Sequence, residues 1–245
     1  MTDKKDIIIK FKGEPVTGVF LERLNRFAAM VEIEGVAQRV FVPNSGRMKE
    51  LLVPGVGVYL QYYPLAHRVT QYDLVMVEHG QNLVCIDSRM PNRLLEKALK
   101  AEAIQGFEGL TGIKREAALG SSRLDFLLEY GDQRVYIEAK SVTLVVDGEA
   151  RFPDAPTPRG TRHLMELTHQ AQEGERAAVL FLVQRDDAKQ FAPNDSTDPE
   201  FGRALREANR AGVEIQVWTC RVEPGVVYLN TRIPVRLDRE NEKSC

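Results

Sequence analysis

The chain has 245 residues, of which 43% are hydrophobic and 28% are charged, and its formal net charge is −2. This composition excludes a disordered or fibrous chain, and the near-zero charge gives no overall basic character of the kind expected of a nucleic-acid-binding protein. No apolar run approaches the ~18 residues of a membrane span, and the N-terminus lacks the apolar core of a signal peptide. The three cysteines form neither a disulfide framework nor a metal-ligand pattern. We therefore expect a cytoplasmic protein that does not associate with membranes.

The first third of the chain is predicted to be all β. Short strand-like runs follow one another closely, separated by glycine and proline turn signals, at residues 7–11, 15–21, 27–33, 36–42, 56–63, 72–77 and 82–86. Such spacing favours a small barrel or sandwich. A five-stranded barrel of the oligonucleotide-binding (OB) type fits residues 1–87, and any other small β-barrel is the alternative.

Residues 88–245 are predicted to form a second, α/β domain. Helical spacing begins at Pro91 and again near Thr161, and a third helix follows an Asp198 cap and stops at Gly212. Between 141 and 160 part of the chain is compatible with a short hairpin arm. The remaining strands are expected at 113–119, 123–129, 134–140, 177–183 and 213–219. Strands that alternate with helices imply a mixed sheet with helices packed on its faces.

The hairpin predicted within 123–140 brings two carboxylates together. Gly131-Asp132 is a two-residue turn with glycine first, as type II′ hairpins prefer. The register that follows from this turn places Asp125 directly opposite Glu138, with Cβ atoms roughly 5 Å apart on one face of the sheet. A longer turn or a bulge would shift this register.

Opposed carboxylates repel each other unless a cation or a shared proton offsets their charge. Asp125 and Glu138, with the carbonyl of Ala139 as an extra ligand, match the hard oxygen donors that Mg²⁺ or Mn²⁺ accepts. Lys140 lies on the same face and is suited to position a nucleophile or stabilise developing charge. The alternative is an ordinary exposed strand face, on which Asp, Glu and Lys commonly alternate.

Two further residues are candidates for this site. Glu116, on the preceding strand, would supply a third acid. His163, on the second helix, lies three residues before Glu166 and shares a face with it. For each of them the alternative is an exposed or purely structural role.

At these residues the chain resembles the sugar fermentation stimulation protein A (SfsA) family of bacteria and archaea. The resemblance covers essentially the full length and is carried by segments 23–35, 42–48, 92–94, 122–129, 136–144, 152–167, 177–185 and 211–218. The family implies an N-terminal OB-like barrel followed by a PD-(D/E)xK, restriction-endonuclease-like domain with a mixed sheet. In that nuclease pattern Asp125, Glu138 and Lys140 match the first acid, the second acid and the lysine.

The chain departs from the family pattern at two places. Leu124, and not proline, precedes Asp125, as in many nucleases of this superfamily. Phe41 and Val42 stand before the turn at 43–46, where members of the family commonly carry histidine and cysteine. This second departure argues against a metal or thiol role for that turn.

Basic residues mixed with aromatics suggest a nucleic-acid contact in the barrel. Residues 1–87 contain ten basic and ten acidic side chains, but 23–72 contain six basic against three acidic. Basic side chains contact phosphates and aromatic rings stack on bases. The expected nucleic-acid-binding residues are Arg23, Arg26, Arg47 and Lys49 in the barrel and Arg159 in the second domain. Aromatics buried in the core and charges on a solvated face are the alternative.

Two functions are favoured by these observations. The first is a DNA-binding protein with a Mg²⁺- or Mn²⁺-dependent, nuclease-like site that hydrolyses phosphodiesters, so that the chain is a possible enzyme. The second, implied by the resemblance, is a non-catalytic DNA-binding regulator of sugar (maltose) metabolism. A sugar-responsive protein is a third reading, since OB barrels also bind oligosaccharides. A homodimer is compatible with either, and the sequence does not set the oligomeric state.

Overall fold

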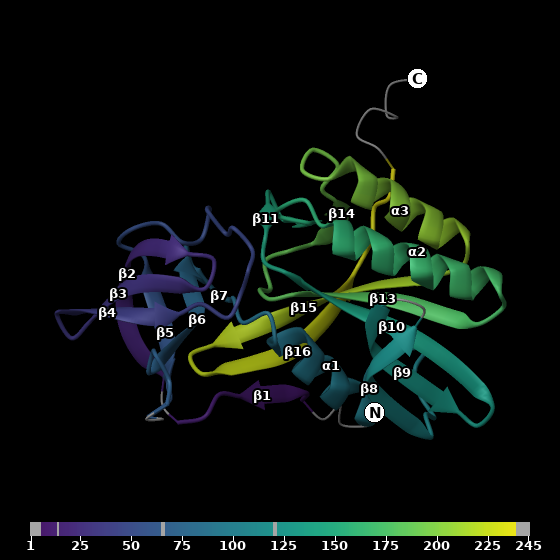
Figure 1. The fold of residues 1–245 in the computed structure, drawn as a ribbon, viewed down its shortest axis with the longest axis horizontal. Helices are drawn as coiled ribbons and strands as arrows, with labels where there is room; N and C mark the ends of the chain where they lie inside the picture. The colour runs from purple at the N-terminus through teal and green to yellow at the C-terminus, as the bar shows by residue number, and fades with distance from the viewer. Residues whose placement is uncertain (1–5, 14, 65–66, 120–121, 239–245) are drawn as a thin grey trace.

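The computed structural model describes residues 6–13, 15–64, 67–119 and 122–238. Two bodies are visible in Figure 1, a small β-barrel and a larger α/β domain that packs against it. None of the helices in the described part of the chain combines the length and hydropathy that a bilayer span needs. Cys85 and Cys220 are buried free thiols, and Cys245 lies outside the described residues.

The barrel is formed by the N-terminal strands. Its sheet has the order β4-β3-β2-β5-β6-β7, and an additional parallel pairing between β4 and β6 closes five of the strands into a ring. The strands are β2 (Val16–Asn25), β3 (Ala28–Ile33), β4 (Val36–Phe41), β5 (Gly57–Tyr62), β6 (Tyr72–His79) and β7 (Asn82–Cys85). Alternate residues of these strands fill the interior, among them Phe20, Val31, Val40, Leu60 and Leu74.

A seven-stranded mixed sheet forms the second domain, in the order β1-β16-β15-β13-β10-β9-β8. Its strands are β1 (Ile8–Lys10), β8 (Gly112–Leu119), β9 (Ser122–Tyr130), β10 (Gln133–Val142), β13 (Arg176–Val183), β15 (Glu214–Glu223) and β16 (Val226–Ile233). The strands β10, β13 and β15 run parallel to one another. A smaller sheet beside it contains β11 (Val145–Val146), β12 (Glu149–Phe152) and β14 (Gln190–Pro193). The arm expected between 141 and 160 is the β11–β12 hairpin of this sheet.

One predicted strand lies elsewhere than expected. The run at 7–11 was assigned to the barrel, but β1 pairs antiparallel with β16 at the edge of the second domain's sheet. The chain therefore begins and ends its described strands in the same sheet, and the barrel is formed by the strands that follow β1. The predicted boundary near residue 88 falls between the end of β7 at Cys85 and the start of α1 at Met90.

Three helices cover the two faces of the large sheet: α1 (Met90–Lys100), α2 (Pro158–Gln172) and α3 (Pro199–Arg210). Figure 1 shows α1 on one face and α2 with α3 on the other. The third helix follows the prediction, because the side chain of Asp198 accepts a hydrogen bond from the backbone N–H of Phe201 at 3.0 Å. The second helix begins at Pro158, a few residues earlier than expected, with Thr157 as its cap.

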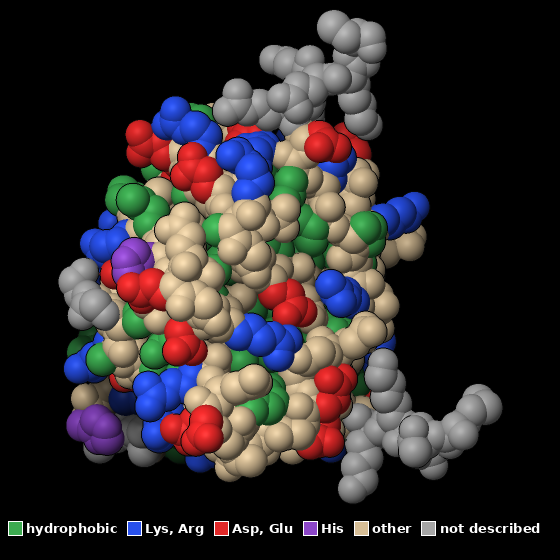
Figure 2. Space-filling model, turned by 90° about the vertical axis from the view of Figure 1, so that its right-hand side faces the viewer, with side chains coloured by type: hydrophobic (Ala, Val, Ile, Leu, Met, Phe, Trp, Pro, Cys, Tyr) green, Lys and Arg blue, Asp and Glu red, His purple; other side chains and the backbone are tan. Residues whose placement is uncertain are grey.

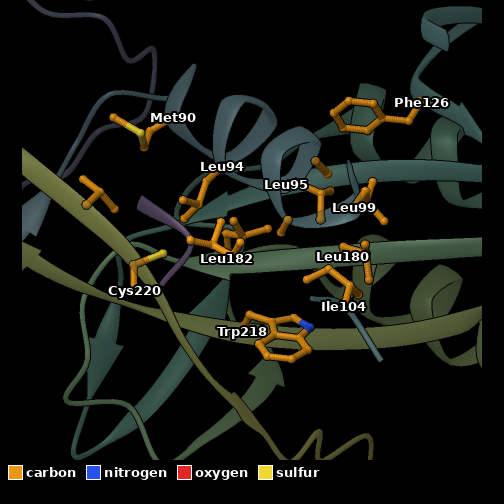
Figure 3. Close-up of a cluster of buried hydrophobic side chains, with 14 of the residues drawn as sticks. Met90, Leu94, Leu95, Leu99, Ile104, Phe126, Leu180, Leu182, Trp218 and Cys220 are labelled. Atoms are coloured by element: carbon orange, nitrogen blue, oxygen red, sulfur yellow. The ribbon is translucent and has the colours of Figure 1, made fainter. Parts of the chain in front are cut away.

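The strand β13 is apolar throughout because both of its faces are covered. Ala178, Leu180 and Leu182 belong to the core under α1, and Val179 and Phe181 belong to the core under α2 and α3. Figure 3 shows the first of these cores, in which Leu94, Leu95 and Leu99 of α1 pack over the sheet near Trp218 and Cys220. Barrel residues including Val75 and Met76 join the same core, so the two domains share buried apolar surface.

Candidate functional site

The site lies where the β9–β10 hairpin opens. The register of this hairpin is the predicted one, with recorded pairs that run from Tyr130–Gln133 to Phe126–Ile137. Beyond the last pair, the side chain of Asp125 takes the place of the ladder, because its Oδ2 accepts a hydrogen bond from the backbone N–H of Ala139 at 2.8 Å. The irregularity extends to β8, where Glu116 has a φ of 51° between two regular pairs with β9.

Asp125 is held by groups from two elements. In addition to the N–H of Ala139, the side-chain amide of Asn92 in α1 donates a hydrogen bond to Oδ1 at 2.6 Å. Burial raises the pKa of Asp125, and the negative charge of Glu138 raises it further, although both hydrogen bonds oppose this change. A carboxylate with a raised pKa gains stability from a nearby positive charge.

Glu138 is almost fully buried, with 4% of its surface exposed. Its Oε1 accepts a hydrogen bond from Lys140 Nζ at 2.5 Å and lies 2.6 Å from Nδ1 of His163. Burial alone would raise the pKa of Glu138, but the hydrogen bonds from His163 and Lys140 and the positive charge of Lys140 outweigh it and lower the pKa. Glu138 is therefore held as a carboxylate inside the protein.

The second oxygen of Glu138 is different. Oε2 is buried and has no hydrogen-bond partner among the described residues. A buried carboxylate oxygen without a partner costs free energy, of the order of 1–3 kcal/mol. This oxygen is available to a ligand that binds between the strands.

His163 is oriented by its own helix. The guanidinium Nε of Arg159, one turn earlier in α2, donates to His163 Nε2 at 3.4 Å. Since Nε2 accepts this hydrogen bond, Nδ1 carries the proton and donates it to Glu138. The helix that carries both residues starts at Thr157, whose side chain accepts a hydrogen bond from the N–H of Gly160. Arg159 itself is exposed.

Of the predicted site residues, the structure brings together Asp125, Glu138, Lys140 and His163. It does not bring Glu116 to them, because the Glu116 side chain is 71% exposed and pairs with Arg123 at 3.7 Å. The positive φ of Glu116 accompanies this outward position, since it changes the direction of the side chain relative to a regular strand.

The basic residues predicted to bind nucleic acid divide into two groups. Arg26, Arg47 and Lys49 are exposed. The guanidinium of Arg23, in contrast, donates to five backbone carbonyls in two turns: those of Asn25 and Arg26 at the β2–β3 turn, and those of Asn44, Gly46 and Arg47 in the loop after β4. Its donors are used inside the protein, so Arg23 joins the β2–β3 turn to the loop that follows β4 within the barrel.

Sequence reasoning did not single out Asn92 as a site residue. The sequence feature that identifies Asn92 is its position on α1. It lies three and seven residues before Leu95 and Leu99, which are both buried. An amide on the apolar stripe of a helix requires a polar partner. In this fold that partner is Asp125.

The side chains of this site supply part of the ligand set of a divalent cation. Within the described residues, no three acidic, histidine or cysteine side chains form a group that would hold a metal ion. Asp125 and Glu138 supply two carboxylates, one with a raised pKa and one with a buried oxygen that has no partner. Mg²⁺ is commonly bound by one or two carboxylates, with waters filling the other positions. The residues present therefore fit such an ion.

Comparison with known proteins covers nearly the whole chain. Residues 21–86 match the family model described as the SfsA N-terminal OB domain, and residues 89–226 match the sugar fermentation stimulation protein RE domain. A sugar fermentation stimulation protein homolog from Caldanaerobacter subterraneus subsp. tengcongensis is 46% identical over 226 residues, which cover 92% of this chain and 99% of that protein. The homolog from Moorella thermoacetica is 43% identical over 234 residues, 94% of this chain and 100% of that protein.

A solved structure has the same fold. The structure of Pyrococcus furiosus SfsA in complex with Ca²⁺ superposes with a TM-score of 0.86 at 33% sequence identity. The match covers 93% of this chain and 98% of that one, so both the barrel and the mixed sheet are included.

Proposed function

Because this chain belongs to the sugar fermentation stimulation protein family, we propose that it binds DNA and hydrolyses its phosphodiester bonds at a PD-(D/E)xK-like site. The observation that carries the proposal is the group at the opening of the β9–β10 hairpin. Asp125, Glu138 and Lys140 have the order and spacing of that nuclease pattern, and the N–H of Ala139 binds Asp125 between them. The two acids are kept close although their charges repel, which is costly in a site with no function.

Asp125 and Glu138 would hold a divalent cation, with the carbonyl of Ala139 as a third oxygen donor. The related protein from Pyrococcus furiosus was solved with Ca²⁺, which supports a divalent cation in this chain as well. Mg²⁺ or Mn²⁺ at this site would neutralise charge on a phosphate and lower the pKa of a bound water. Ca²⁺ prefers more ligands and a looser geometry, so it would occupy the site with less activity.

The side chains of the chain have separate tasks in this proposal. Lys140, with 12% of its side chain exposed, keeps a positive charge beside the acids and stabilises the charge that develops on the phosphate oxygens. His163 donates to Glu138 and fixes the carboxylate in one orientation. Asn92 does the same for Asp125 from the other face of the sheet. Such supporting hydrogen bonds are a common requirement of metal-dependent sites.

A second candidate function is a non-catalytic DNA-binding regulator of sugar metabolism. The observation that favours it is the saturation of the site by the protein itself. Both oxygens of Asp125 and one of Glu138 already accept hydrogen bonds, and the described residues include no third acid at this position. In this case the site would be a structural remnant, and binding would not depend on its carboxylates.

Cleavage assays separate the two functions. The purified protein is incubated with end-labelled single-stranded, duplex and branched DNA, and with RNA, in Mg²⁺, Mn²⁺, Ca²⁺ or EDTA. We expect cleavage in Mg²⁺ or Mn²⁺ that is lost in EDTA and in Asp125→Asn, and retained in Asp132→Asn, an exposed carboxylate in the turn of the same hairpin. Equal cleavage by the wild type and Asp125→Asn would refute the proposed site. Binding without cleavage under all conditions would favour the regulator.

A further inference from the structure

The outer surface of the barrel carries an aromatic pair beside the β2–β3 turn, in which Phe27 is exposed and Phe41 is half-buried. Phe27 is 47% exposed, and its ring stacks against that of Phe41 with centroids 6.3 Å apart and an angle of 22° between the planes. We call these two residues the aromatic platform. Leu24, which is 43% exposed, lies near the end of β2, just before this turn. Large apolar side chains gathered on a surface commonly mark a binding site.

The platform is rigid. The N–H of Val42 donates to the carbonyl of Phe27 at 2.9 Å, and the N–H of Phe27 donates to Oδ1 of Asn25 at 2.9 Å. Ala28 pairs with Phe41 in the β3–β4 ladder. Because the backbone on both sides of the rings is fixed, a ligand that stacks on them does not have to order them first.

Exposed basic residues lie near the platform along the chain. Arg26 is adjacent to it in the turn, and Arg39 lies two residues before Phe41 on β4. Arg47 and Lys49 follow in the next loop, and none of these four side chains has a carboxylate partner elsewhere in the described residues. The acids Glu32 and Glu34 lie at the far end of the β3–β4 hairpin. The opposite end of the molecule is different, since Figure 2 shows Lys and Arg interspersed with Asp and Glu there.

The platform is connected to the catalytic region. Phe41 ends β4, and the chain continues into the turn that Arg23 ties together through the carbonyls of Asn44 and Gly46. The backbone N–H of Arg47 donates to Asp154 at 3.0 Å. Asp154 precedes α2, the helix that carries the His163 bound to Glu138. A nucleic-acid strand bound to the platform is therefore held by the part of the barrel that contacts the second domain beside the site of Glu138 and His163.

We propose that the aromatic platform stacks the bases of a single-stranded nucleic acid, with the phosphates of that strand against Arg26 and Arg39. Aromatic rings bind bases of any sequence because every base has a π face, and neighbouring cations bind the backbone. A duplex would not use the platform, since its bases already stack on one another. OB barrels present this combination of strands and turn to oligonucleotides. The inference rests on the proposed function, and it adds that the substrate strand is unpaired where it contacts the barrel.

The test is a binding measurement that does not require catalysis. Fluorescence anisotropy is recorded in EDTA, in the Asp125→Asn background, with labelled single-stranded oligonucleotides and with a duplex of the same sequence. We expect Phe27→Leu to weaken single-strand binding at least about fivefold, with less than a twofold change for the duplex. Phe27→Trp restores stacking and should bind as tightly as the parent. Val36→Ala, an exposed apolar truncation at the far end of β4, is the matched control and should have no effect.

The substitutions distinguish stacking from the alternatives. Leucine preserves an apolar side chain, so single-strand binding by Phe27→Leu equal to that of the parent would overturn the proposal. Equal weakening for the duplex would also overturn it, because it would show a contact with the backbone or a loss of fold. Thermal unfolding of each variant identifies misfolding, and Phe27 is exposed enough for the fold to be retained. If no substrate is cleaved but the single-strand preference holds, the proposed hydrolysis fails and the platform stands.

Discussion

Asp125 and Glu138 lie on neighbouring strands, yet their hydrogen bonds come from opposite faces of the sheet. Asn92 reaches Asp125 from α1, and His163 reaches Glu138 from α2. The two helices therefore hold two like charges close together at the opening of one hairpin. This arrangement stores electrostatic repulsion that a cation would relieve.

Removal of that repulsion should stabilise the fold. Asp125→Asn keeps the shape of the side chain and can still accept the N–H of Ala139, while the amide of Asn92 rotates to accept from the new amide group. We expect the free energy of unfolding at neutral pH in EDTA to rise by ~1 kcal/mol, since the raised pKa of Asp125 records an unfavourable carboxylate. Urea unfolding measures it, and a variant less stable than the wild type would contradict the expectation.

Divalent ions should make the wild type more stable than Asp125→Asn. An ion that binds only the folded state stabilises it by RT ln(1 + [L]/Kd), so the unfolding temperature rises as the ion concentration exceeds the Kd. Mg²⁺, Mn²⁺ or Ca²⁺ should therefore raise the unfolding temperature of the wild type and leave that of Asp125→Asn almost unchanged. Asp132→Asn should respond like the wild type. An equal rise in Asp125→Asn and in the wild type would show that the ions bind elsewhere.

His163 should affect the rate of phosphodiester cleavage through its hydrogen bond to Glu138. Its hydrogen bond lowers the pKa of Glu138, so His163→Ala should raise that pKa and move the acidic limb of the pH–rate profile to higher pH. The loss of a supporting hydrogen bond at a metal site reduces activity about 10- to 100-fold. His163→Gln, which can still donate to the carboxylate, should recover part of the rate. A lower rate with an unmoved acidic limb would indicate only a structural role.

The junction of the two domains should be sensitive to pH. Arg185 is 3% exposed and pairs with Asp187 at 2.5 Å, and Asp187 also accepts from Asn82 of the barrel. Burial would raise the pKa of Asp187, but the hydrogen bond and charge of Arg185 lower it below its ordinary value. The stability gained from this carboxylate is therefore complete above the unfolded pKa of about 3.9 and is lost as the pH falls through the lower folded value.

Asp187→Asn leaves the buried guanidinium of Arg185 without its partner charge. We expect a loss of about 2 kcal/mol at neutral pH, below the about 3–5 kcal/mol typical of a broken, fully buried pair, because Asp187 is partly exposed. The difference from the wild type should shrink as the pH falls below 4. Asp186→Asn, an exposed neighbour, is the control, and a difference that grows at low pH would be inconsistent with this assignment.

Arg23 should be needed for stability and not as a cation alone. Its planar guanidinium donates to five carbonyls of the β2–β3 turn and the loop after β4, a geometry that a lysine ammonium cannot reproduce. Arg23→Lys should therefore destabilise the protein by about 2 kcal/mol, nearly as much as Arg23→Ala. Arg26→Lys should be neutral. Chemical denaturation measures both, and full stability of Arg23→Lys would argue against the structural role.

Arg39 should contribute to the salt dependence of single-strand binding. If it contacts one phosphate of a single strand, Arg39→Gln should reduce the slope of log K against log salt by about 0.7 and weaken binding to all sequences alike. Arg210→Gln, exposed at the end of α3, should leave the slope unchanged. A sequence-dependent loss would point to base recognition and not to a phosphate contact.

Local patterns predicted much of the fold and of the site. A two-residue turn sets the register of a hairpin, so Gly131-Asp132 was enough to bring Asp125 near Glu138. The alternation of apolar residues placed the β10 and β13 strands correctly. The sequence did not reveal that the ladder ends before Asp125, because the side chain that replaces it obeys the same alternation as its neighbours.

Long-range pairings were harder to predict. The β14 strand contains a proline and carries little strand signal, whereas Pro224-Gly225 marks the turn into β16 and was available in the sequence. The partner of Asn92 depends on how α1 packs across the sheet, which no local pattern encodes. Glu116 was predicted on the strand that precedes the one carrying Asp125, but its backbone conformation directs its side chain to solvent.

The pairing of β1 with β16 has a consequence for the synthesis of the protein. During translation, the barrel strands leave the ribosome long before the strand that completes the sheet containing β1. The barrel strands can pair with one another early, while β1 has no partner until β16 has been synthesised. Closure of the larger sheet therefore requires β16 to have been synthesised, and it joins strands that are more than two hundred residues apart in the chain.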